Sequence, residues 1–149
     1  MARFAYRMQG ILNVKEKLET QAKNEFAIAA AELAAQEEKL REYYDRMDEY
    51  EKCLEELYKK NLDIRKIIET QEAVELLKYQ IRMQKLKVKT AEKNLEEKRE
   101  ALSEAMLERK THDKLKEKAF EEFLKEEAAG ESKEIDELVS YRFGQGSKE

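Results

Sequence analysis

The sequence predicts an all-α fold, a long antiparallel two-helix coiled coil. The first reason is that the chain has no proline, and only one of its 4 glycines, Gly10, lies before Gly130. The second is that apolar side chains recur about every 3.5 residues, the spacing of helices that pack side by side. The third is that this pattern matches itself when the sequence is folded back about Asn61. Together they favour a hairpin over a compact globule.

The match across Asn61 joins positions whose residue numbers add to about 121, as the facing layers of a coiled coil would. The apolar pairs are Leu57 with Ile64, Leu54 with Ile67, Met47 with Val74, Leu40 with Ile81, Leu33 with Val88, and Phe26 with Leu95. Tyr50 is also expected to face Gln71, and Gln36 to face Lys85. The alternative is a helix that continues through the middle of the chain, which would require an antiparallel dimer.

The hairpin is expected to form a single domain over residues 1–128. Its first helix is expected at about 3–58 and its second at about 64–128. Between them lies a tip at about 59–63, where Asn61 suits a left-handed helix end and Asp63 suits an N-cap.

The remaining residues, 129–149, are expected to form a flexible tail because the last three glycines lie there. A short amphipathic segment around Ile135, Leu138 and Val139 is expected within this tail.

The first helix should contribute a continuous seam of side chains to the helix pair. The expected members are Phe4, Met8, Ile11, Leu18, Ala22, Phe26, Ala29, Leu33, Leu40, Tyr43, Met47, Tyr50, Leu54 and Leu57. On the second helix one row is strictly apolar, but the other contains Gln84 and Lys98 beside Leu77 and Ala91. A seam with one weak row predicts low thermal stability for the isolated chain.

Composition and charge exclude several classes of protein. Charged residues make up 43% of the chain, the mean hydropathy is −0.91 and tryptophan is absent, so a large core is not expected. The net charge is only −4, which gives no general attraction to nucleic acid. No apolar run approaches the roughly 20 residues that cross a bilayer, and no secretory signal opens the chain. We expect a cytoplasmic protein with no direct membrane insertion.

The sequence offers no catalytic, metal or cofactor site. Two helices side by side enclose no pocket. The single histidine, His112, lies among lysines and one aspartate, which are too few ligands for a metal. Cys53 is the only cysteine and is expected to be a bystander on the helix surface. We therefore expect a protein that is not an enzyme and binds no cofactor.

Aromatic and leucine side chains gather toward the predicted tip. Tyr43 and Tyr50 are expected in the seam, and Tyr44 beside it, where exposed aromatic side chains commonly anchor interfaces. Leu76 and Leu77 add more apolar surface than one seam row needs. This half of the hairpin is the best candidate for a docking surface.

A basic run lies on the second helix, formed by Arg82, Lys85, Lys87 and Lys89. The fold-back rule places this run opposite acidic residues of the first helix, namely Glu32, Glu37 and Glu38. Ion pairs between the helices are the expected explanation, and nucleic-acid binding is the weaker alternative.

The two ends of the chain carry the most specific patterns. The opening segment contains Phe4, Tyr6, Met8, Gln9, Leu12, Val14, Glu19, Ala22, Lys23 and Asn24. The closing segment contains Glu108-Arg109-Lys110, the run from Asp113 to Lys118, Ile135 to Leu138, and Arg142-Phe143. Over nearly its whole length the chain resembles the FliJ family, small coiled coils of the bacterial flagellar export apparatus.

This resemblance implies a stalk similar to the gamma subunit of rotary ATPases. It implies partners in the hexameric export ATPase FliI, whose ring assembly the family promotes, in the export gate protein FlhA and in export chaperones. The protein would then lie at the cytoplasmic face of the inner membrane. The equivalent stalk of a virulence-type type III secretion system, or a generic coiled-coil scaffold, remains an alternative.

The resemblance also assigns site residues. Those expected to contact the ATPase ring are Phe4, Met8, Ile11, Leu115, Phe120 and Phe123. Those expected to contact the export gate are Tyr43, Tyr44, Tyr50, Leu76 and Leu77. The chain departs from the family pattern near the tip, with Arg46 in place of a tyrosine and Ala73 in place of an aromatic residue.

Overall fold

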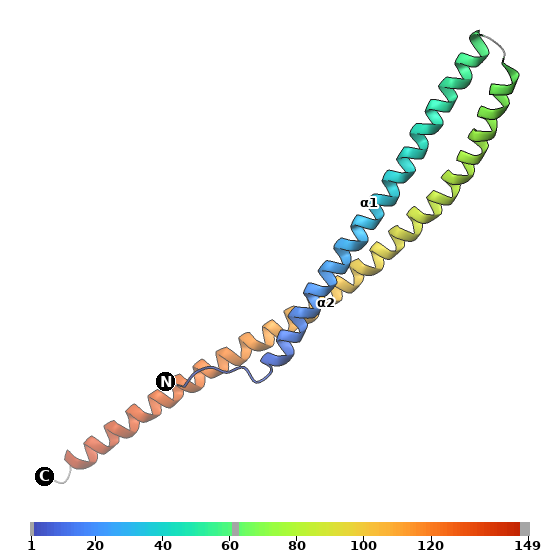
Figure 1. The fold of residues 1–149 in the computed structure, drawn as a ribbon. Coiled ribbons are helices and arrows are strands. Elements are labelled where there is room, and N and C mark those ends of the chain that lie inside the picture. Colours follow the sequence, from blue (N-terminus) through green and yellow to red (C-terminus); the bar gives the residue numbers. More distant parts are fainter. Residues whose placement is uncertain (1, 61–62, 147–149) are drawn as a thin grey trace. The chain divides into compact units, whose positions relative to one another are not determined.

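The structure is a computed structural model that describes residues 2–60 and 63–146. Two helices account for most of these residues: α1, Gln9–Lys60, and α2, Ile64–Gly146 (Figure 1). The described residues contain no strand, so the predicted all-α class is confirmed. The predicted turn residue Asn61 lies outside the described residues.

The start of α2 follows the sequence prediction. The Asp63 carboxylate accepts a hydrogen bond from the Lys66 amide at 3.4 Å. The Asp63 carbonyl also accepts one from the Ile67 amide at 3.1 Å. Asp63 therefore caps a helix that begins at Ile64, because it satisfies amides that have no partner within the first turn.

Both outer helix bounds differ from the predicted ones. α1 begins at Gln9 rather than near residue 3. The segment before it is not helical and instead packs against α2 through the Phe4 ring. α2 does not end near residue 128 but continues to Gly146. A single glycine costs a helix about 1 kcal/mol, and the Glu, Lys and Ala residues around Gly130 are strong helix formers.

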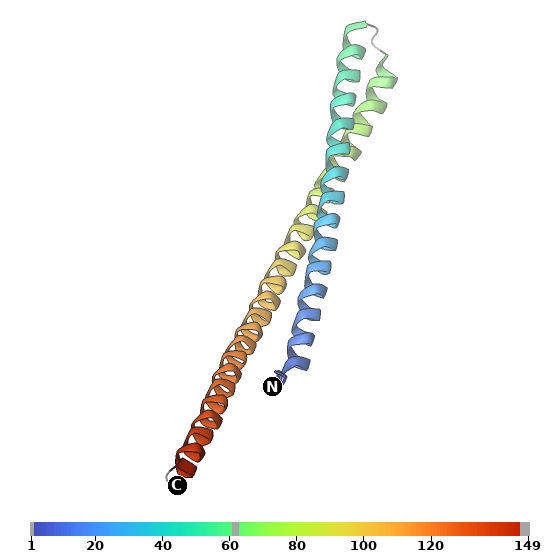
Figure 2. The same ribbon diagram turned by 90° about the vertical axis from the view of Figure 1, so that its left-hand side faces the viewer.

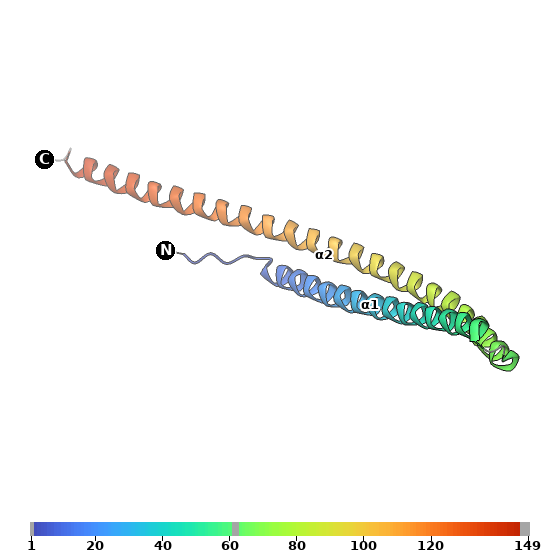
Figure 3. The same cartoon turned by 90° about the horizontal axis from the view of Figure 1, so that it is seen from above.

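The chain divides into two compact units, each of which pairs a part of α1 with a part of α2. Unit 1 comprises residues 1–20 and 104–149, and unit 2 comprises residues 21–103. In unit 2 the two helix segments run antiparallel, side by side (Figures 2 and 3).

The core of unit 2 is a seam between α1 and α2. Its most buried apolar side chains are Ala29, Ile67, Leu77, Ile81 and Ala91. The other seam side chains are half-buried, and on α1 they include Phe26, Leu33, Leu40, Tyr43, Met47, Tyr50, Leu54 and Leu57. The predicted seam is therefore correct for this part of α1.

Two predicted pairings at the tip end of unit 2 are wrong. Ile64, expected to face Leu57, is exposed in the first turn of α2. Gln71 donates a hydrogen bond to the Tyr58 hydroxyl at 3.2 Å rather than facing Tyr50.

The seam of unit 1 differs more strongly from the prediction. Leu12 and Glu19 are buried, whereas the expected seam residues Met8, Ile11 and Leu18 are exposed. The less exposed positions of α1 are spaced alternately by three and four residues along the whole helix, and this spacing places positions 12, 15 and 19 in the seam. The prediction followed apolar residues across this part of the chain, whereas the seam follows the period even where it meets charged residues.

Candidate interaction surfaces

A polar layer interrupts the apolar seam of unit 2. Gln84 is only 2% exposed, and its side-chain amide donates to the Gln36 side-chain oxygen at 2.6 Å and to the Gln36 carbonyl at 2.9 Å. Gln36 in turn donates to Glu32 at 2.8 Å. From the sequence, Gln84 was expected to weaken the apolar seam, and Gln36 was expected to face Lys85. In the structure Gln84 joins the two helices through satisfied hydrogen bonds, which fixes their register.

Charged side chains occupy the seam of unit 1. The Arg109 guanidinium binds the Glu19 carboxylate of α1 and, at 2.8 Å, the Asp113 carboxylate on its own helix. These carboxylates raise the pKa of Arg109, so the guanidinium remains charged. Lys15 Nζ contacts Glu108 at 2.9 Å. The hydrogen bond and the positive charge of Lys15 lower the pKa of the Glu108 carboxyl from its usual value of 4.5.

The N-terminal segment is held to α2 by aromatic contacts. The Phe4 ring lies 5.1 Å from that of Phe120 and 5.4 Å from that of Phe123. A hollow of about 800 Å³ beside these rings is lined by Phe4, Ala5, Tyr6, Arg7, Met8, Ala119, Glu122, Phe123 and Glu126. Three of the residues expected at the ATPase ring therefore meet in one cluster.

The other residues expected at the ring are exposed in unit 1. Met8 lies just before α1, Ile11 lies on α1 and Leu115 lies on α2, and all three are exposed. Phe120 of the aromatic cluster is also partly exposed, at 43%. Sequence reasoning missed further exposed apolar side chains of the same unit, namely Val14, Leu18, Leu107 and Leu124. On α1 these exposed residues have the same spacing as the seam but lie one position before it, so a second apolar row could have been recognised in the sequence.

The residues expected at the export gate fall into different environments in unit 2. Tyr44 and Leu76 are exposed. Tyr43 and Tyr50 are half-buried, in the seam positions predicted for them. Leu77 is only 3% exposed, so it packs in the core and presents no surface to another protein.

The basic run on α2 does not form the ion pairs with α1 that the sequence predicted. In residues 2–60 and 63–146 no ion pair joins it to Glu32, Glu37 or Glu38. The glutamates instead bond along α1, where Glu38 binds Arg41 and Glu32 accepts from Gln36. Lys85 Nζ lies 5.8 Å from the centre of the Tyr44 ring, in a cation–π contact.

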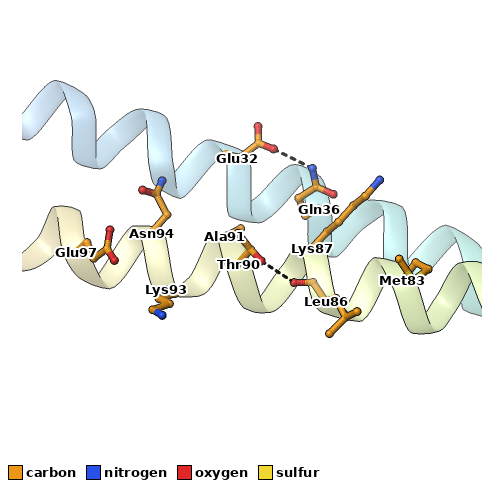
Figure 4. Close-up of a pocket in the computed structure, with 10 residues that line it drawn as sticks. All are labelled: Glu32, Gln36, Met83, Leu86, Lys87, Thr90, Ala91, Lys93, Asn94 and Glu97. Carbon is orange, nitrogen blue, oxygen red and sulfur yellow. Dashed lines mark hydrogen bonds between the residues drawn. The ribbon is translucent and has the colours of Figure 1, made fainter.

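The outer face of α2 in unit 2 carries exposed apolar side chains that the sequence analysis did not single out as a row. We call this row the outer stripe, and it consists of Ile68, Leu76, Tyr79, Met83 and Leu86. A groove of about 660 Å³ lies beside the C-terminal end of the stripe, at Met83 and Leu86 (Figure 4). Its lining residues are Glu32, Gln36, Met83, Leu86, Lys87, Thr90, Ala91, Lys93, Asn94 and Glu97.

The remaining candidates for chemistry are isolated side chains. Cys53 is exposed. His112 is half-buried, and its Nδ1 has no hydrogen-bond partner among the described residues. No cluster of three His, Cys, Asp or Glu side chains suited to a metal occurs in the described part of the chain. Within the same residues, no helix is long and apolar enough to cross a membrane.

Each unit is thus a pair of helices with apolar side chains on its outside, an arrangement suited to binding other proteins. The class that this fold defines is the two-helix coiled-coil adaptor. Comparison with known proteins narrows the class.

The model of the family described as flagellar FliJ protein matches residues 4–148. The flagellar FliJ protein of Bacillus subtilis (strain 168) is 27% identical over 140 residues, which cover 94% of this chain and 95% of the relative. Among solved structures, a chain described as a YscO homolog from Chlamydia trachomatis has the same fold. It superposes with a TM-score of 0.67 and 22% identity, over 99% of each chain.

The chain belongs to the flagellar FliJ protein family. Proteins of this family are noncatalytic components of the type III export apparatus.

Proposed function

We propose that this protein is the stalk of the flagellar export ATPase, which promotes assembly of the FliI ring and links it to the export gate protein FlhA and to export chaperones. The observation that carries the proposal is the family match over residues 4–148. The protein would act in the cytoplasm, at the inner membrane, where it is held by these partners.

Unit 1 is the part proposed to enter the ATPase ring. It supports this role because Met8, Ile11, Leu115 and Phe120 expose apolar surface that its own seam does not use. Phe4 and Phe123 hold the N-terminal segment against α2, so both ends contribute to one surface. Exposed apolar surface of this kind is typical of a protein interface.

Unit 2 is the part proposed to contact the export gate. Of the residues expected at the gate, Tyr44 and Leu76 are exposed, and Tyr43 and Tyr50 are half-buried in the seam. Lys85 fixes one face of the Tyr44 ring. Leu77 is not proposed as a contact because it is buried.

The test is the ATPase activity of the cognate FliI, measured with and without the purified chain. The wild-type chain is expected to raise the activity and the fraction of FliI that sediments as a ring. Ile11→Asp combined with Leu115→Asp should abolish both effects. Ile28→Asp is the control, because Ile28 is an exposed apolar residue that lies in unit 2. Failure of the wild-type chain to bind or stimulate FliI would overturn the proposal.

A second candidate is the equivalent stalk of a virulence-type secretion system. The observation in its favour is the shared fold with the YscO homolog. The two candidates separate in a binding experiment that offers the purified chain to the flagellar and to the virulence-type ATPase of one organism. Tighter binding to the flagellar enzyme is expected.

A further inference from the structure

The outer stripe of α2 faces away from α1 within unit 2. Tyr79 lies two residues from both Leu77 and Ile81, which are buried in the seam, and two residues turn a helix by about 200°. Leu76 and Tyr79 are accordingly 60% and 54% exposed. α2 therefore has two apolar faces, and α1 covers only one of them.

Charge changes sign along the outer stripe. Before Tyr79 the stripe carries Glu72 in its own row and Glu75 on a flank, and after Met83 its flanks carry Lys87 and Lys89. Across the described residues, neither lysine takes part in an ion pair, and neither does Glu72. Glu75 contacts only Lys78, one turn further along its own helix. The stripe thus has an acidic half and a basic half of similar length.

We propose that the outer stripe is an interface for a second copy of this chain, in which the two α2 helices pack antiparallel about a two-fold axis. A surface with one acidic and one basic half is its own complement only when the second copy runs in the opposite direction. A parallel pair would place glutamate against glutamate and lysine against lysine. An isologous contact of this kind closes at a dimer and leaves no surface for further growth.

The spacing of the stripe fixes the register of the pair. Positions whose numbers add to about 162 face each other, as in an antiparallel coiled coil. Leu76 of one copy then meets Leu86 of the second copy, and Tyr79 meets Met83. The axis passes between Tyr79 and Met83, so each contact occurs twice.

The same register brings opposite charges together. Glu75 and Lys89 lie on one flank of the stripe and Lys87 lies on the other, whereas Glu72 lies seven residues before Tyr79, in the row of the stripe itself. In the antiparallel pair both glutamates therefore lie against the basic half of the second copy. Arg82 alone lies near its own counterpart, where its long side chain can extend into water. Because all these charges are exposed, they should select the orientation while the apolar layers provide most of the affinity.

The test uses paired charge reversals in the full chain and sedimentation equilibrium over about 10 µM to about 1 mM, the range of a weak dimer. The wild-type mass should rise from 17.7 kDa toward twice that value. One variant, Glu72→Lys/Glu75→Lys, makes all four of these charged positions positive, and another, Lys87→Glu/Lys89→Glu, makes all four negative. Each alone should dimerise at least about tenfold more weakly. Their equimolar mixture should regain the dimer, because the four substituted or matching positions of one copy then carry the opposite charge to those of the other.

The matched control is Glu49→Lys/Glu55→Lys, which makes the same charge change at exposed positions of α1. It should dimerise as the wild type does. Helix content from circular dichroism verifies that each variant is folded. The proposal is overturned if the wild-type chain stays monomeric over this range, if the mixture stays monomeric, or if the control weakens the dimer equally. Every substitution lies in unit 2 and leaves unit 1 unchanged, so stimulation of FliI tests the proposed function separately.

Discussion

Replacing Gln84 by alanine should measure how much the polar layer contributes to the stability of unit 2. The substitution removes the hydrogen bonds at 2.6 Å and 2.9 Å to Gln36. A typical hydrogen bond contributes about 0.5–1.5 kcal/mol net, so the pair accounts for about 1–3 kcal/mol. Loss of one buried methylene adds about 0.8 kcal/mol.

The total loss should lie near the lower end of this sum. Gln36 is half-buried and already bonds to Glu32, so its side-chain oxygen can turn toward water after the substitution. We therefore expect a loss of about 2 kcal/mol in the free energy of unfolding. For a chain of about 150 residues this corresponds to a fall of roughly 4–8 °C in Tm.

The assay is thermal unfolding followed by circular dichroism, with Gln71→Ala as the matched control. Gln71 also donates a hydrogen bond across the helices, to Tyr58, but in an exposed position, so its loss should cost less than about 0.5 kcal/mol. Equal Tm values for Gln84→Ala and the wild type would refute the reasoning. So would a control that is destabilised as strongly as Gln84→Ala.

Three further predictions concern unit 1 and the whole chain. Phe4→Ala should release the N-terminal segment from the Phe120 ring and speed tryptic cleavage after Arg7 at least about tenfold; an unchanged cleavage rate would contradict this. The pKa of Glu108 is lowered in the folded state, so its contact with Lys15 stabilises unit 1 above the unfolded pKa and is lost as pH falls through the folded one. Glu108→Gln should therefore flatten the acid side of the stability–pH curve, which urea unfolding at a series of pH values will check. The isolated chain should melt within or below the usual range of about 45–65 °C, and a cooperative melt above it would count against a weak seam.

The period of the sequence predicted the helix pairing better than its hydrophobicity did. In unit 2 both agree, and Phe26, Leu40 and Leu54 lie in the seam as expected. In unit 1 they diverge, because the strict period passes through charged positions while Ile11 and Leu18 lie outside it. A rule that places apolar residues inside fails where the seam is built from ion pairs.

The contacts that could not be predicted are those in which polar side chains satisfy one another. The fold-back rule places Gln84 within one residue of the position that faces Gln36, but it does not indicate which side-chain atoms bond, because that depends on side-chain conformations on both helices. Arg109 is a similar case, since it bonds to Glu19 of α1 and to Asp113 of α2 at once. The contact between Phe4 and Phe120 requires an N-terminal segment that is not helical, which the unbroken apolar pattern did not indicate.

The seam of unit 1 combines the buried Leu12 with charged side chains, while other apolar residues of the unit lie outside the seam. Glu19 is 6% exposed and bonds to Arg109, while Ile11 and Leu115 remain in contact with water. Buried ion pairs contribute little net stability because both charges lose their hydration, whereas exposed apolar side chains gain free energy when another surface covers them. Unit 1 should therefore gain more free energy when a partner covers its exposed apolar side chains than it gains from packing of its own two helices. We infer that binding, rather than intramolecular packing, accounts for the placement of its apolar residues, and that unit 1 should gain more stability from FliI than unit 2 does.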